Sequence, residues 1–126
     1  MSNQGLPKSA RIKSRASLEQ LFASGKSFSI FPIKIFYNAS DFENSKAPVQ
    51  IGVGVSARNF KKATERNRIK RLLRETYRTQ QELIIVPEGK KLDVFFLYIG
   101  KELPAFVDLK LVLASVMKKL SERLNK

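Results

Sequence analysis

The longest apolar run of the chain, Val94 to Ile99, lies within the segment LDVFFLYI that begins at Leu92. As a strand, this segment would present apolar side chains on both of its faces. Strands of this kind are covered on two sides, as central or parallel strands are. The run is also too short to cross a bilayer as a helix. We therefore expect it to lie inside a sheet that other elements cover on both faces.

The remaining elements follow from the spacing of apolar residues, which is three to four in a helix and two in a strand. The expected helices are 14–24, 61–83 and 105–124, and the expected strands are a short one around Phe28, then 33–38, 49–56 and 92–99. Residues 39–48 (ASDFENSKAP) have turn composition and predict a hairpin loop. The order αβββαβα predicts the α+β class, as a small α-β sandwich with a four-stranded mixed sheet.

One face of the expected strand 49–56 carries few side chains. Every second residue from Val49 to Val55 is branched and apolar, whereas the residues between them include Gly52 and Gly54. Two glycines on one face of a strand can mark the close approach of another backbone. A partner packed tightly on the sheet explains them equally well, and the sequence leaves both explanations open.

The chain shows no internal repeat, and its Pro and Gly residues are scattered rather than gathered in a linker. Its 126 residues, of which 43% are hydrophobic, suit one compact domain with a real core. Residues 1–13 (MSNQGLPKSARIK) are polar and basic, and we expect a flexible N-terminal arm there. Residues 14–126 are expected to form the single domain.

Two residue types that enzymes often use are absent. Without Cys the chain has no disulfide, thiolate zinc site or Cys nucleophile, and without His it lacks the commonest general base and metal ligand. An enzyme made of this chain alone would depend on its 11 acids, its lysines or its hydroxyl groups. The N-terminus has no apolar segment of a signal peptide, so we expect a cytoplasmic protein without a membrane partner.

Positive charge is concentrated in two stretches. The chain carries 24 Lys and Arg against 11 Asp and Glu, a formal net charge of +13. Nine basic and two acidic residues lie between Arg58 and Arg78, and residues 8–15 add four basic residues and no acid. Such a field attracts phosphate polyanions or anionic lipid, and binding gains free energy from released counterions. Nucleic acid is the first partner to expect.

On a helix, the residues of 61–83 divide into two neighbouring arcs. One arc is apolar and the other basic, with Ile69, Leu72, Leu73, Thr76 and Tyr77 on the first and Arg66, Asn67, Lys70, Arg71, Arg74 and Arg78 on the second. The first arc would pack on the sheet and the second would face a partner. Arg can donate two parallel hydrogen bonds to a phosphate, and Asn can both donate to and accept from base edges. A helix that only keeps the fold soluble would not concentrate one sign of charge on one side.

The string KATERNRIKRLLRE, from Lys62 to Glu75, follows the strand GVGVS and closely resembles the motif of the bacterial ribonuclease P protein component. That motif is an Arg-Asn-x-x-Lys-Arg core on a helix, with a strand and a Lys before it. Upstream, Arg11-Ile12-Lys13 and the helix that follows resemble the basic arm and first helix of the family. The last strand and the last helix also match, so the resemblance covers most of the chain.

The resemblance implies a function that composition alone does not. The family is the protein subunit of an RNA-based endonuclease that removes the 5′ leader from precursor tRNA. The RNA subunit holds the catalytic Mg²⁺ ions, while the protein binds the RNA subunit and the leader. We therefore expect no catalytic residue and no bound metal in this chain. In the family fold, an α-β sandwich, the motif helix lies in an uncommon left-handed crossover between parallel strands.

The resemblance also implies site residues. The expected RNA-binding residues are Arg11, Lys13, Arg58, Lys62, Arg66, Asn67, Arg68, Lys70, Arg71 and Arg74. The family has a cleft between the first helix and the sheet where aromatic residues meet the single-stranded leader, and Leu18, Phe22 and Phe36 match it here. Stacking of unpaired bases on aromatic rings beside a basic groove gives a sequence-tolerant site. Phe22 and Phe36 could equally be ordinary core residues.

The chain departs from the family pattern at three places. Leu18 stands where many members carry an aromatic residue, and Ala57 stands where the end of the strand often carries Lys. At the end of the last strand, Tyr98-Ile99-Gly100-Lys101 differs from the common Ala-Arg-Pro ending.

Two other functions compete with this interpretation. A general RNA-binding or ribosome-associated protein would explain the charge and the fold class, but not the strand before the motif or the matching arm and first helix. A protein-only nuclease would need carboxylates to hold metal ions. The acids available for it are Asp41, Glu43, Asp93, Glu102 and Asp108, which show no motif spacing.

Overall fold

The computed structural model describes Ile12, residues 15–41 and residues 49–125. The elements are α1 (Arg15–Ser24), β1 (Lys26–Ile30), β2 (Ile33–Asp41), β3 (Val49–Val55), α2 (Ala63–Arg78), the short 3-10 helix η2 (Gln81–Leu83), β4 (Lys90–Tyr98) and α3 (Phe106–Leu124). Apart from η2, this is the predicted order αβββαβα, and the α+β class is confirmed. No helix of the described residues is long and apolar enough to span a membrane.

The four strands form one mixed sheet in the order β1-β2-β4-β3. β2 pairs with β1 and with β4 in antiparallel fashion, whereas β3 runs parallel to β4. β4 therefore lies inside the sheet, as its two apolar faces predicted. The predicted hairpin between the second and third strands is wrong, because β4 lies between β2 and β3 and keeps the described parts of these strands from pairing. A strand that is apolar on both faces buries more apolar surface inside the sheet than it would at an edge.

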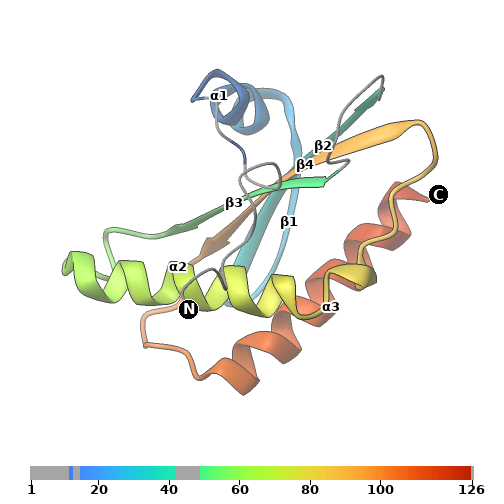
Figure 1. Ribbon diagram of the computed structural model, residues 1–126. Coiled ribbons are helices and arrows are strands. Elements are labelled where there is room, and N and C mark those ends of the chain that lie inside the picture. The colour runs from blue at the N-terminus through green and yellow to red at the C-terminus, as the bar shows by residue number, and fades with distance from the viewer. Residues whose placement is uncertain (1–11, 13–14, 42–48, 126) are drawn as a thin grey trace, which may run out of the picture.

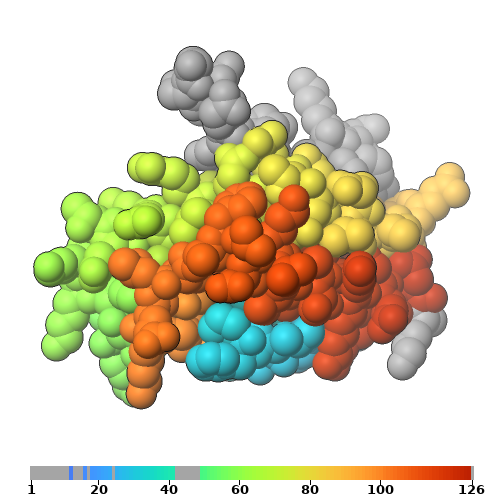
Figure 2. Space-filling model, turned by 90° about the horizontal axis from the view of Figure 1, so that it is seen from below, coloured from blue at the N-terminus to red at the C-terminus, as the bar shows by residue number. Residues whose placement is uncertain are grey.

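The sheet is covered on both faces (Figure 1). The ten-residue helix α1 lies on one face, and the longer helices α2 and α3 lie on the other. α2 packs along β3, while α3 contacts β1 and β2. Figure 2 shows this helical side, with residues of β1 and β2 in cyan next to α3 in orange and red. The two sides of the sheet thus present different surfaces to a partner.

The main core lies between the sheet and the two longer helices. Its centre consists of side chains without exposed surface, among them Ile33, Ile35, Ile69, Leu73, Leu92, Val94, Phe96 and Leu113. The buried residues of α2 are Ile69, Leu73, Thr76 and Tyr77, with Leu72 partly buried beside them. The predicted apolar arc is thereby confirmed, and the basic arc is turned away from the core.

Two predicted boundaries are wrong by three or more residues. The helix predicted to reach Leu83 ends at Arg78, because Gln80 leaves helical geometry and its side-chain amide donates to the carbonyl oxygen of Lys110 in α3 at 3.0 Å. β2 continues to Asp41, three residues into the predicted loop, because its pairing with β4 extends to Lys90. The ammonium of Lys90 lies 2.8 Å from a carboxylate oxygen of Asp41 and lowers the pKa of that acid. Contacts with distant segments of the chain therefore set the end of α2 and the end of β2.

The stability of the core should fall at alkaline pH, because the phenol of Tyr77 is buried. Burial raises the pKa of Tyr77 from 10.0 to about 12. The pKa of Tyr77 is higher in the folded protein than in the unfolded chain. The free energy of unfolding is therefore unaffected by this group below pH 10, and it falls as the pH rises towards 12. This group alone should lower the free energy of unfolding by roughly 1 kcal/mol near pH 11.

Urea unfolding of the wild type and of Tyr77→Phe, at neutral pH and near pH 11, measures this loss. The phenylalanine variant should lose roughly 1 kcal/mol less than the wild type, because it has no phenol to ionise. Burial also raises the pKa of Tyr98, but Tyr98 is present in both proteins and its effect cancels. An equal loss in both proteins would mean that Tyr77 does not carry the effect.

Candidate nucleic-acid interface

The predicted RNA-binding residues from 58 to 74 lie along the side of α2 that faces away from the core and on the turn before it. Arg58, Lys62, Asn67, Arg68 and Arg71 are exposed, and Arg66, Lys70 and Arg74 are half-buried. We call these eight residues the basic surface. Arg11 and Lys13 were predicted to extend it, but they lie outside the described residues.

The turn between β3 and α2 is held at both ends by side chains. The amide of Asn59 donates to the carbonyl oxygens of Ile99 and Gly100, both at 3.2 Å, and so ties the turn to the end of β4. Nη1 of Arg66 donates to the carbonyl oxygens of Phe60 and Lys61, both at 2.8 Å. Arg66 thus positions the start of α2, and its remaining N–H groups can still donate to a phosphate.

Arg68 and Arg71 are the clearest candidates for direct phosphate binding. Both are exposed, and within the described part of the chain neither has a hydrogen-bond or ion-pair partner. Arg78, at the end of the same helix, differs because it is paired with Glu75. Two unpaired guanidinium groups one turn apart can each donate to a different phosphate.

The predicted cleft residues lie on the opposite face of the sheet, between α1 and the strands. The rings of Phe22 on α1 and Phe36 on β2 meet edge to face, with 5.0 Å between centroids and an interplanar angle of 78°. Phe22 is 47% exposed and Phe36 is half-buried, so Phe22 does not belong to the core. Leu18, one turn earlier on α1, reaches towards Gly52 of β3. The structure therefore brings all three residues to this face.

Phe95 of β4 belongs to the same group, although it was not predicted. Its ring centroid lies 5.1 Å from that of Phe22, and the strand register places it between Phe36 and Gly52. A Cβ atom on Gly52 or Gly54 would come within 2.8 or 2.7 Å of the Phe95 ring. The two glycines thus leave room for the ring of Phe95, a side chain of the neighbouring strand β4. We call Phe22, Phe36 and Phe95 the aromatic cluster.

Lys34 is a second residue of this face that was not predicted. It lies two residues before Phe36 on β2, and its ammonium is 5.2 Å from the centroid of the Phe36 ring. The alternation of side chains along a strand, which puts Lys34 and Phe36 on one face, was the signal available in the sequence. A cation beside exposed rings suits a single nucleic-acid strand, because the rings stack on bases and the cation attracts phosphates.

No three of the acids proposed for a protein-only nuclease come together among the described residues. In the described part of the chain, no three acidic side chains lie close enough to share a metal ion. Asp41 is paired with Lys90, and Asp93 lies on β4, where burial raises its pKa while Lys91 lowers it. Glu43 lies outside the described residues.

Comparison with known proteins gives sequence matches along most of the chain. Residues 6–121 match the family model described as Ribonuclease P. The ribonuclease P protein component of Porphyromonas gingivalis is 33% identical over 105 residues, which cover 81% of this chain and 76% of that protein. The component from Chlorobium phaeobacteroides is 34% identical over 118 residues, covering 84% and 81% of the two chains.

Solved structures share the fold. The RNase P protein from Thermotoga maritima has a TM-score of 0.68 at 23% identity and covers 86% of this chain and 96% of its own. The Staphylococcus aureus RNase P protein has a TM-score of 0.67 at 19% identity, with 92% and 98% covered. With the family model matching residues 6–121 and relatives more than 30% identical along most of their length, the chain belongs to the ribonuclease P protein family.

Proposed function

We propose that this chain binds the RNA subunit of ribonuclease P through the basic surface and the 5′ leader of precursor tRNA through the aromatic cluster. The observation that carries the proposal is the separation of two chemically different surfaces on opposite faces of one sheet. Exposed arginines on α2 suit the phosphates of a folded RNA, and the half-exposed ring of Phe22 suits the unpaired bases of a leader.

The division of labour follows from what the chain contains. Hydrolysis at the mature 5′ end of tRNA requires metal ions, which in this family the RNA subunit supplies as Mg²⁺. The described residues hold no carboxylate cluster, and the chain has neither His nor Cys. Its residues would therefore bind and orient the two RNAs without taking part in proton transfer or bond cleavage.

Several finer features are part of the same proposal. We infer that Arg11 and Lys13 extend the basic surface from the N-terminal arm, and that residues 14–126 act as one domain. α2 would lie in the left-handed crossover that is characteristic of the family, and the protein would act in the cytoplasm together with its RNA partners. A general RNA-binding protein would need only the basic surface, and it would leave the exposed ring of Phe22 without a role.

Cleavage of a precursor tRNA by a bacterial ribonuclease P RNA at low Mg²⁺ concentration tests the proposal. The protein should stimulate cleavage only when the RNA subunit is present. Tight binding to unrelated RNA without stimulation would support the general RNA-binding function instead. Cleavage by the protein alone would mean that its carboxylates are catalytic after all.

A further inference from the structure

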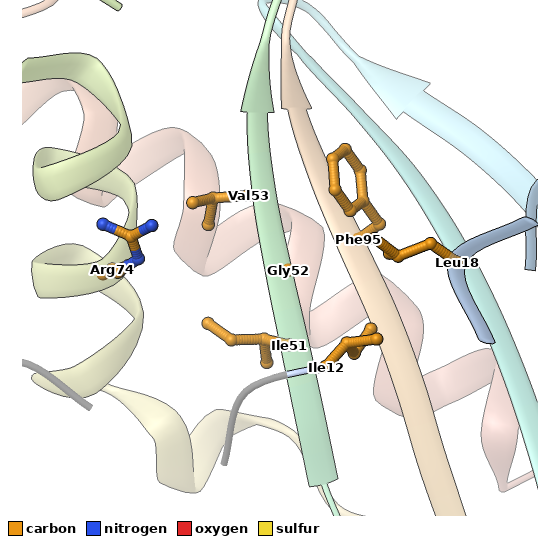
Figure 3. Close-up of a pocket in the computed structure, with 7 residues that line it drawn as sticks. All are labelled: Ile12, Leu18, Ile51, Gly52, Val53, Arg74 and Phe95. Atoms are coloured by element: carbon orange, nitrogen blue, oxygen red, sulfur yellow. The ribbon is translucent and has the colours of Figure 1, made fainter. Parts of the chain in front are cut away.

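An exposed apolar surface at the start of α3 contains no residue of the two proposed RNA surfaces. The hollow around Gly52, by contrast, lies between Arg74 of the basic surface and Phe95 of the aromatic cluster, so it belongs to the sites already described (Figure 3). Figure 2 shows the start of α3 in orange beside the cyan residues of β1 and β2. The exposed apolar residues there form what we call the α3 patch, which consists of Phe31, Leu103, Phe106, Val107 and Leu111.

The α3 patch leaves large apolar side chains in contact with water. Phe31, in the turn between β1 and β2, is 73% exposed. Val107 and Leu111, one helical turn apart on α3, are 66% and 65% exposed. Single exposed apolar residues are ordinary, but a group of them on one surface marks an interaction site. The core is not that site, because α3 packs against the core with a different face that includes Leu109 and Leu113.

A groove of about 220 Å³ lies between the β1–β2 turn and the start of α3. Pro32, which follows Phe31, forms part of its wall together with Tyr98 and Val112. The phenol of Tyr98 donates to the carbonyl oxygen of Glu102 at 2.6 Å, and the N–H of Ile99 donates to that of Pro32 at 2.8 Å. These hydrogen bonds join the turn, the end of β4 and the segment before α3, so the groove is formed without a ligand.

The charges around the α3 patch cancel, in contrast to those of the whole chain. Residues 99–117 contain two basic residues, Lys101 and Lys110, and two acidic ones, Glu102 and Asp108, whereas the chain carries a net charge of +13. Glu102 and Asp108 line the groove, and among the described residues neither forms an ion pair. Nucleic acid and anionic lipid bind clusters of cations, which this surface does not offer. A protein is the partner that suits it.

A second copy of this chain has the complementary shape and charge. In a dimer with two-fold symmetry the same surface faces itself, so each feature must find its complement within that surface. The exposed ring of Phe31 lies beside a groove whose volume exceeds the roughly 150 Å³ that accommodates a benzene-sized ring. Lys101 is next to Glu102, so the cation of each copy can approach the acids of the other.

We propose that two copies of this chain associate through the α3 patch, with Phe31 of each copy in the groove of the other. The contact uses no residue of the basic surface or of the aromatic cluster, so it does not depend on the proposed RNA binding. The patch and the groove together comprise about half of the 20 to 30 residues that a standard interface uses on each side. The dimer is therefore weak and forms at high protein concentration.

Sedimentation equilibrium of the full chain, free of RNA and over a wide range of concentrations, tests the dimer. Phe31→Ala should weaken association by about 30-fold or more, the loss expected when a buried aromatic anchor is removed from an interface. Phe31 is exposed in the single chain, so the variant should keep its stability. Ile85→Ala is the matched control, because Ile85 is 62% exposed and lies outside the patch. It should associate like the wild type.

The salt dependence separates this dimer from copies that are bridged by contaminating nucleic acid. Salt screens the repulsion between two chains of net charge +13, so association through the α3 patch should strengthen as the salt concentration rises. Bridging by nucleic acid would weaken instead, because it depends on phosphate contacts. Association that falls with salt would therefore overturn the proposal.

Photo-cross-linking tests the placement of Phe31 without changing that residue. Ala105 is exposed and lines the groove, so Ala105→Cys can carry a photoreactive group there. It should give a covalent dimer in which the group is joined to the peptide of the other copy that contains Phe31. Asn67→Cys, on the basic surface, is the control and should give no covalent dimer. A dimer joined at any other peptide would contradict the placement of Phe31 in the groove.

Two further outcomes would overturn the proposal. The first is a chain that stays monomeric at every concentration, or a Phe31→Ala variant that dimerises as well as the wild type. The second is a monomeric chain that binds vesicles of neutral phosphatidylcholine and loses this binding in Phe31→Ala, which would make the α3 patch a lipid-binding surface.

Discussion

Replacing both Arg68 and Arg71 with glutamine should weaken binding of the ribonuclease P RNA by about 3 to 6 kcal/mol, since a hydrogen bond to a charged group contributes about 1.5 to 3 kcal/mol. The slope of log affinity against log salt should also fall by about 1.4 to 1.8, or 0.7 to 0.9 for each lost phosphate contact. Both side chains are exposed, so the fold should keep its stability. Titration of the RNA subunit at several salt concentrations measures both quantities.

The matched control changes the same number of charges elsewhere. Lys101 and Lys118 are exposed residues outside the basic surface. Their double replacement by glutamine should leave affinity close to that of the wild type. An equal loss in the two double variants would show that net charge alone drives binding. Arg66 is a poorer probe, because Arg66→Gln also removes two hydrogen bonds that hold the turn before α2.

Phe22→Leu and Phe36→Leu should reduce the preference of the holoenzyme for precursor over mature tRNA. The expected loss is about 1 to 3 kcal/mol for each base that no longer stacks on a phenylalanine ring. Leucine keeps an apolar side chain but offers no flat surface on which a base can stack. Because Phe22 is 47% exposed, its replacement should change the free energy of unfolding little. Dissociation constants for precursor and mature tRNA give the preference directly.

Phe60→Leu serves as the control for these rings. Phe60 is 5% exposed and belongs to the core, where its ring contacts Tyr98. Its replacement should lower stability and leave the preference for precursor tRNA unchanged. If Phe22→Leu and Phe36→Leu behave like Phe60→Leu, the two rings are packing residues and the leader binds elsewhere.

The helices, the strands and the two arcs of α2 were predictable because each depends on residues a few positions apart. The interior position of β4 was also predictable, since its apolar faces require cover on both sides. The strands that pair with β4 were not predictable, because strand order depends on contacts between distant segments. The hairpin predicted after β2 failed for that reason.

The site shows the same division. Arg68 and Arg71 could be proposed as RNA-binding residues from the motif, and Phe22 and Phe36 as leader-binding residues from the resemblance to the family. Phe95 could not, because its place beside Gly52 and Gly54 follows only from the register between β3 and β4. The double role of Arg66 was equally hidden, since its bonds to the turn depend on the path of the backbone before α2.

Site-directed cross-linking tests most directly whether the two faces of the sheet hold different RNAs. The chain has no Cys, so a single introduced Cys can carry a photoreactive group at one known position. Asn67→Cys introduces the group on the basic surface. Ser27→Cys introduces it on β1, at the residue that pairs with Phe36 of β2. Ser115→Cys on α3 is the control. In the holoenzyme with precursor tRNA, position 67 should cross-link to the RNA subunit, position 27 to the leader, and position 115 to neither. Cross-links from position 67 to the leader, or from position 27 to the RNA subunit alone, would contradict the assignment of the two faces.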